Sequence, residues 1–118
     1  MKERSSCALT YAGTTAELAL RNGPLNLVTR SMLRELDGAL SEIVGRPDLR
    51  CLILHGGEAR AFCAGSDMKE FAGLRANARE DKILPEDTML RRIEQLPMPT
   101  IAAIDGPALG GGLELALS

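Results

Sequence analysis

A run of three glycines followed closely by a carboxylate is the stretch of this sequence best suited to chemistry. The glycines, residues 110–112, separate an apolar run over 101–104 from another over 113–117, and Glu114 is the only charged residue after Asp105. Glycine allows a backbone to approach a ligand closely. The pattern predicts an interior strand, a glycine loop and the first turn of a helix that carries Glu114.

A second loop of similar design follows the apolar run RCLILH, residues 50–55. It contains Ala64, Gly65, Ser66 and Asp67 and leads into an expected helical turn at MKEF. Each loop should present free backbone N–H groups at the positive end of a helix dipole. If the two strands are neighbours, these groups can converge on one oxygen atom as an oxyanion hole, in which each donor contributes about 2.7–4 kcal/mol in the transition state.

A purely structural explanation of both loops stays open. Glycines between a strand and a helix often serve tight packing, and a glutamate in a first helical turn often offsets the dipole. Phosphate sites fit poorly, because GPALGGG lacks the second glycine of GxGxxG and no Lys-Ser/Thr follows it. Ser66 is outside any GxSxG motif and His55 is the only histidine, which argues against a serine-hydrolase triad. One histidine and three cysteines without CxxC spacing also argue against a zinc site.

The composition predicts one small domain of ordinary globular type. The chain has 118 residues, 45% of them hydrophobic, and a net charge of −2. With no basic stripe, we expect no nucleic-acid partner, although an anionic small ligand stays open. The N-terminus lacks a signal-peptide apolar region, and no apolar run reaches the ~20 residues of a membrane span. Cys51 and Cys63 are expected to be reduced core residues of a cytoplasmic protein.

The predicted elements follow the order ββ-α-β-(α)-α-β-α, which fits an α/β sheet with functional loops at its strand ends. Apolar runs over 7–11 and 16–20 on either side of a Gly-Thr turn predict a hairpin. A helical period begins at Met32 and ends at Gly45. Its predicted apolar face contains Met32, Leu33, Leu36, Ala39, Leu40, Ile43 and Val44, with Asn26 or Thr29 as the N-cap.

The region between the two glycine loops is expected to change from an irregular to a helical structure along its length. Residues 75–95 are predicted to be polar and mobile at first and then helical. Two prolines end this helix before a strand over 100–104. The predicted apolar positions of the helix are Met89, Leu90, Ile93 and Leu96.

The two loop motifs resemble the signatures of a known family. AFCAGSDMKEF is similar to the AF-x-AG-x-D-[LIM]-KE signature of the crotonase (enoyl-CoA hydratase/isomerase) superfamily. PTIAAIDGPALGGGLELAL is similar to its second signature, P-x-IAA-[IV]-[ND]-G-x-A-x-GGG-x-ELAL, and NGPLNLVTRSMLREL to the start of its first helix. The resemblance covers nearly the whole chain in order, and it is much more specific for the superfamily than for the reaction.

The resemblance implies an acyl-CoA thioester as the substrate, whose carbonyl the backbone N–H groups of Ser66 and Gly111 would bind. These donors would stabilise an enolate-like oxyanion. Ser66 stands where the family usually has alanine, a change that a backbone donor tolerates. Lys69 is expected either to pair with an anionic group or to be a solvated helix residue. The implied substrate- and CoA-binding residues are Ala64, Ser66, Asp67, Met68, Lys69 and Gly111, with Phe71 and Leu74 as core or acyl-pocket residues.

Glu114 matches the first of two acid/base glutamates in the hydratases. There the two carboxylates orient the water that adds across the α,β double bond, and a proton is delivered to Cα. No cofactor and no metal are implied, since acyl-CoA is the substrate. The implied fold is the ClpP/crotonase spiral of repeated ββα units, in an enzyme of fatty acid metabolism that forms a homotrimer or a dimer of trimers at full length.

The family's second glutamate lies downstream, in a region that this sequence does not contain. We therefore expect residues 1–118 to be the N-terminal part of one crotonase-like core domain, truncated before its C-terminal part and trimerisation helices. Enoyl-CoA hydratase is the leading function. The alternatives are an enoyl-CoA isomerase, another crotonase-family lyase or decarboxylase, and a truncated, inactive relative that associates through exposed apolar surface.

Overall fold

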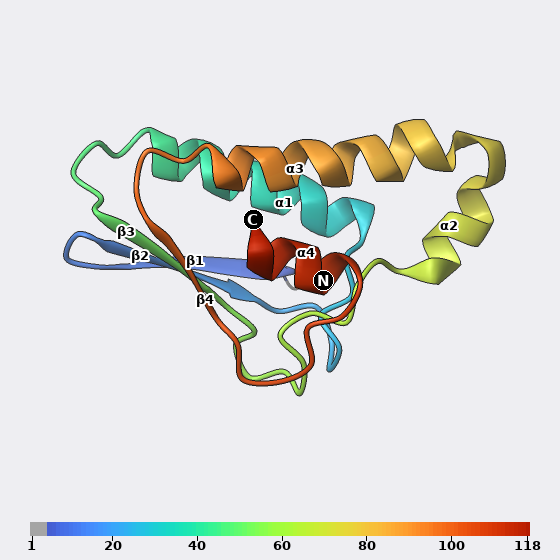
Figure 1. Ribbon diagram of the computed structural model, residues 1–118, viewed down its shortest axis with the longest axis horizontal. Helices are drawn as coiled ribbons and strands as arrows, with labels where there is room; N and C mark the ends of the chain where they lie inside the picture. Colours follow the sequence, from blue (N-terminus) through green and yellow to red (C-terminus); the bar gives the residue numbers. More distant parts are fainter. Residues whose placement is uncertain (1–4) are drawn as a thin grey trace.

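A four-stranded sheet in the order β1-β2-β3-β4 is the centre of the fold, seen in a computed structural model that describes residues 5–118 (Figure 1). Helices join the strands in the predicted order. The elements are β1 (Cys7–Ala12), β2 (Thr15–Leu20), α1 (Arg30–Val44), β3 (Cys51–His55), α2 (Met68–Leu74), the short helical turns η1 (Arg75–Asn77) and η2 (Arg79–Ile83), α3 (Leu84–Glu94), β4 (Thr100–Ala103) and α4 (Gly111–Leu117).

The sheet combines one hairpin with two parallel pairings. β1 and β2 are antiparallel, which confirms the predicted hairpin, and Gly13 supplies the positive φ of +62° that its tight turn needs. β2 pairs with β3, and β3 with β4, in parallel, so that Leu18 lies beside Leu54 and Leu54 beside Ala102. Parallel strands need crossover connections, which α1 and the α2–α3 segment provide.

One face of the sheet carries the hydrophobic core. Alternate residues of β2 and β3 are buried, as the two-residue period of a strand requires. Figure 1 shows α1 and α3 lying alongside each other over the sheet, and the two helices pack together. The core cluster includes Leu18, Leu20, Leu52 and Leu54 from the sheet, Met32, Leu36, Leu40 and Ile43 from α1, Met89 and Ile93 from α3, and Leu115 from α4.

Thr29, not Asn26, caps α1. The Thr29 hydroxyl accepts a hydrogen bond from the Met32 amide at 3.1 Å. Asn26 is instead fully buried, and its side-chain amide donates to three backbone carbonyls of the loop after β3, at 3.0–3.1 Å. The prediction for Val44 is wrong, since its side chain is 53% exposed. With 3.6 residues per turn, Val44 lies about 100° around the helix from Ile43, which takes the buried side.

Two further expectations need correction. Residues 75–83 are helical rather than irregular, because η1 and η2 carry the chain from α2 into α3, and η2 is one turn of π-helix. β4 is not an interior strand within residues 5–118, since it pairs only with β3 and Ile101 is 51% exposed. Leu113 and Leu117 of α4 are also exposed within residues 5–118. An apolar face therefore remains open along β4 and α4.

The first turn of α4 packs directly against the loop that follows β3. A Cβ atom built on Gly112 would lie 1.9 Å from the carbonyl oxygen of Cys63. No real Cβ approaches a backbone oxygen so closely, so the fold requires glycine at this position for steric reasons.

We expect Gly112→Ala to lower the free energy of unfolding by about 1–3 kcal/mol or more, as overpacking of a close contact does. The urea midpoint of the natural protein measures the change. Gly73→Ala is the matched control, because a Cβ on Gly73 of α2 would meet nothing within 4 Å; alanine there should be neutral or stabilising by up to about 1 kcal/mol. Equal midpoints for the two variants would contradict the packing argument.

The three cysteines are all free and differ in burial. Burial, reinforced by the Glu35 carboxylate, raises the pKa of the Cys7 thiol to about 11. Burial also raises the pKa of Cys63, partly offset by a hydrogen bond from the Gly65 backbone, with Glu86 acting in the same direction as burial. Cys51 is only partly buried, which limits the expectation that it is a core residue.

We expect iodoacetamide at pH 7.5 to alkylate Cys51 before Cys7 and Cys63, because the thiolate is the reacting form and a raised pKa keeps a thiol protonated at that pH. Peptide mass spectrometry over a time course gives the three rates. Cys7 should become more reactive as the pH rises toward 11, since its thiol then ionises. Labelling of Cys63 as fast as Cys51 at pH 7.5 would contradict this order.

Candidate active site

The parallel pairing of β3 and β4 continues into the loops that follow the two strands. A bridge joins Cys63 to Ala108, in which the Cys63 amide donates to Pro107 at 3.2 Å and the Leu109 amide donates to Cys63 at 3.1 Å. The two strands are thus neighbours, as the predicted oxyanion hole requires. In Figure 1 both loops run together beyond the carboxyl ends of β3 and β4.

This loop pairing brings the backbones of Ser66 and Gly111 together. A Cβ built on Gly111 would lie 3.7 Å from the Ser66 nitrogen, and one built on Gly65 would lie 3.6 Å from the Gly111 nitrogen. Gly65 and Gly110 have φ values of +108° and +52°, a region that favours glycine. The two glycines therefore permit the backbone turns that bring the amides side by side.

Neither amide donates a hydrogen bond to another group of residues 5–118. The neighbouring backbone is held firmly: Val28 donates to Gly65 at 2.8 Å and accepts from Asp67 at 2.9 Å. A pair of adjacent, unsatisfied N–H groups on a fixed backbone is suited to bind one carbonyl oxygen and the negative charge that develops on it.

A cavity of about 340 Å³ opens beside these two amides. Glu114, in the first turn of α4, lines this cavity and has an exposed side chain. The site therefore joins the three residues that the sequence singled out for chemistry. The lining residues are Val28, Ser66, Phe71, Ile83, Glu86, Asp87, Met89, Leu90, Gly111, Glu114 and Leu115.

The other predicted binding residues lie outside the lining of this cavity. Asp67 caps α2 by accepting from the Lys69 amide at 2.9 Å. The side chains of Met68 and Lys69 are exposed, and the Ala64 amide donates to Leu25. Their roles in CoA binding stay predictions. Of the two candidate acyl-pocket residues, Phe71 lines the cavity and Leu74 does not.

Sequence reasoning did not single out Glu86, which lines the cavity, or Lys82, which lies beside Glu86. Glu86 accepts a hydrogen bond from the Ser66 hydroxyl at 2.5 Å, and the ammonium of Lys82 lies 3.6 Å from the same carboxylate. Lys82 is fully buried; it also donates to Glu70 at 2.7 Å and to the Val28 carbonyl at 3.0 Å.

A signal for Glu86 was present in the sequence. Met89, Leu90 and Ile93 follow it at spacings of three, four and seven residues, which places Glu86 on the apolar face of the same helix. Lys82 is four residues earlier and pairs with Glu86 across one turn. Extending the apolar face backward would have marked both residues as inward-facing charges.

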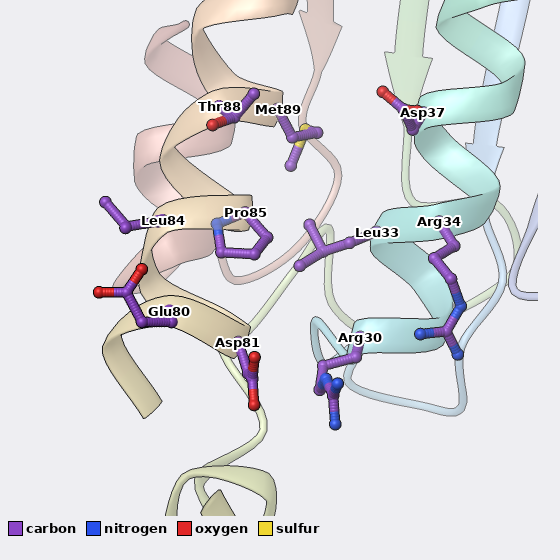
Figure 2. Close-up of a pocket in the computed structure, with 10 residues that line it drawn as sticks. All are labelled: Arg30, Leu33, Arg34, Asp37, Glu80, Asp81, Leu84, Pro85, Thr88 and Met89. Carbon is purple, nitrogen blue, oxygen red and sulfur yellow. The ribbon is translucent and has the colours of Figure 1, made fainter. Parts of the chain in front are cut away.

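A separate cavity of about 480 Å³ lies between α1 and the η2–α3 segment and holds none of the predicted site residues. Figure 2 shows Leu33 of α1 pointing toward Pro85 of α3 across this gap. Arg30, Arg34 and Asp37 come from the α1 side of the gap, and Glu80 and Asp81 come from the η2 side. This second cavity, although larger than the one beside Ser66 and Gly111, contains none of the residues to which the sequence assigns chemistry.

Within residues 5–118, no helix is long and apolar enough to cross a membrane. No group of three or more His, Cys, Asp or Glu side chains in this part of the chain could hold a metal ion.

Comparison with known proteins gives consistent matches over most of the chain. A bacterial protein of Bacillus subtilis named "Probable enoyl-CoA hydratase" is 43% identical over 105 residues, which cover 87% of this chain and 40% of that protein. The mitochondrial methylglutaconyl-CoA hydratase of mouse is 38% identical over 93 residues, covering 79% and 30% of the two chains.

The structural match agrees. The crystal structure of an enoyl-CoA hydratase from Bacillus anthracis superposes with a TM-score of 0.88 at 37% identity, over 95% of this chain and 44% of that one. The chain spans about two fifths of the length of the curated relatives it matches. The family model described as enoyl-CoA hydratase/isomerase matches residues 11–118. With this match over nearly its whole length and a crotonase-type α/β fold, the chain belongs to the enoyl-CoA hydratase/isomerase family.

Proposed function

We propose that this chain supplies the oxyanion hole and the first acid/base residue of an enoyl-CoA hydratase. The observation that carries the proposal is the pair of adjacent, unsatisfied amides of Ser66 and Gly111 in one cavity with Glu114. Family membership supports acyl-CoA as the ligand, and several relatives are named as enoyl-CoA hydratases.

In the proposed reaction, the thioester carbonyl oxygen accepts hydrogen bonds from both amides. Charge moves onto that oxygen as the oxygen of water bonds to Cβ of the 2,3 double bond, giving an enolate. Glu114 holds the attacking water and takes up one of its protons. A proton delivered to Cα then completes the addition, so the product contains the whole water molecule. We expect a second group, outside residues 5–118, to share these proton transfers.

The finer assignments follow from the same proposal. Ala64, Asp67, Met68 and Lys69 border the CoA path, with Lys69 free to approach a CoA phosphate because its side chain is exposed. The reaction needs no metal or other cofactor. The natural protein is proposed to be cytoplasmic, to bind neither nucleic acid nor membrane, and to form a homotrimer or a dimer of trimers.

The open face of β4 and α4 supports one more proposal, on domain organisation. Residues 1–118 are proposed to be the N-terminal part of a single crotonase-like domain, whose further part packs on this face. The relatives' greater length is consistent with such a part. The large apolar side chains exposed here are Ile101, Ile104, Leu109, Leu113 and Leu117.

We expect Glu114→Gln, in the natural protein at the length its organism makes, to lower kcat for hydration of crotonyl-CoA by about 10²–10⁴-fold, the usual contribution of a general acid or base. Binding of butyryl-CoA, measured by calorimetry, should persist, because the oxyanion hole is backbone. Glu94→Gln is the control, since Glu94 is an exposed residue of α3 away from the cavity. Unchanged hydration by the Glu114 variant would remove it from the mechanism.

A 3-enoyl-CoA substrate distinguishes hydratase from isomerase. A hydratase converts crotonyl-CoA to the 3-hydroxyacyl product, whereas an isomerase moves the double bond of a 3-enoyl-CoA to the 2,3 position without adding water. Analysis of the products by mass spectrometry separates the two, because only hydration adds 18 Da, the mass of water. Absence of both activities from the natural protein would favour an inactive relative.

A further inference from the structure

The acyl cavity carries an unbalanced negative charge. Among the described residues that line it, Glu86, Asp87 and Glu114 are carboxylates and none is a cation. The Asp87 carboxylate lies 3.0 Å from the Arg91 guanidinium on the exposed side of α3, which offsets its charge. Glu114 is assigned to the reacting centre by the proposed function. Glu86 is the carboxylate that the proposed reaction does not use.

The surroundings of Glu86 keep its charge in the cavity. Within residues 5–118, the one cation paired with Glu86 is Lys82, whose ammonium is closer to Glu70, at 2.7 Å, than to Glu86, at 3.6 Å. Glu70 also accepts from the backbone amide of Arg30, at 3.0 and 3.3 Å. One lysine is thus shared by two carboxylates, which leaves this group with a net charge of −1.

Glu86 is also held in place beside the proposed thioester site. Its carboxylate accepts from the hydroxyl of Ser66, at 2.5 Å, and the amide of the same residue is an oxyanion-hole donor. Only the short side chain of Ser66 therefore separates the negative charge of Glu86 from the amide that would bind the acyl carbonyl. Apolar residues make up the rest of this wall: Phe71, Ile83, Met89 and Leu90.

We propose that Glu86 is a specificity-determining residue that makes the site select uncharged acyl chains over acyl chains ending in a carboxylate. This inference rests on the proposed function, since it places the acyl chain in the cavity beside Ser66 and Gly111. A terminal carboxylate on a four- or five-carbon chain would come within several ångströms of Glu86. Like charges at about 6 Å repel enough, at an effective dielectric constant of about 20, to weaken binding by about tenfold to a hundredfold.

The test compares an uncharged substrate, crotonyl-CoA, with one whose acyl chain ends in a carboxylate, glutaconyl-CoA, in the natural protein. We expect kcat/KM for the uncharged substrate to exceed that for the carboxylate substrate by about tenfold or more. Glu86→Gln keeps the size and the hydrogen-bond acceptor for Ser66 but removes the charge, and it should reduce this ratio at least severalfold. If the substitution also disturbs the oxyanion hole, it lowers kcat/KM for both substrates equally, and the ratio of the two values does not change.

Glu80→Gln is the matched control. It makes the same chemical change six residues earlier, on an exposed residue that lines the other cavity, and it should leave the ratio unchanged. A ratio near one in the natural protein, or an unchanged ratio in Glu86→Gln, would overturn the inference. An equal drop in Glu80→Gln would do so as well, because the effect would then come from overall charge.

Equilibrium binding separates this inference from the proposed function. Calorimetry with the saturated analogues butyryl-CoA and glutaryl-CoA needs no turnover. A preference for butyryl-CoA that Glu86→Gln reduces would support the selectivity even if hydration were absent, in which case only the proposed reaction fails. Equal affinity for the two analogues in an enzyme that does hydrate crotonyl-CoA would overturn the selectivity alone.

Discussion

The parallel pairing of β3 with β4 is the constraint on which the site depends. Parallel neighbours end at the same edge of a sheet, so the loops after them must share that edge. Here the loops also pair with each other, through Cys63 and Ala108. Gly112 then allows α4 to approach the Cys63 carbonyl more closely than any other residue could. Each of these contacts brings the amide of Gly111 nearer to that of Ser66.

Asn26 fixes the loop after β3 from the segment that precedes α1. It lies before α1 in the chain, yet its buried amide donates to the carbonyls of Gly56, Ala61 and Phe62 in the loop after β3. The thiol of Cys63 donates in turn to the Asn26 carbonyl at 3.0 Å. The site loops are thus fixed by buried hydrogen bonds, whose loss would leave unsatisfied polar groups at a cost of about 1–3 kcal/mol each.

The buried lysine connects α3 to the loop of Ser66. Lys82 bonds the Val28 carbonyl, Glu70 of α2 and, more distantly, Glu86 of α3, and Glu86 accepts from the Ser66 hydroxyl. A buried ion pair contributes little net stability, because desolvation opposes the attraction. Its value here is positional: it sets α3 over the cavity and aims one carboxylate into it. A π-helical turn carries Lys82, and such turns are frequent at functional sites.

The sequence alone determined the order of the elements, the hairpin, the helix whose apolar period begins at Met32 and the two glycine loops, because periodicity, turn residues and caps are local signals. It also pointed to Ser66, Gly111 and Glu114, since both loop motifs are continuous in the chain. Only the tertiary structure decided that Asn26 supports a distant loop rather than capping α1. The partners of Lys82 and Glu86 likewise come from segments far apart in the sequence, and no local pattern specifies which buried charges will meet. The exposure of Val44 and of β4 was decided in the same way, by which elements come to cover them.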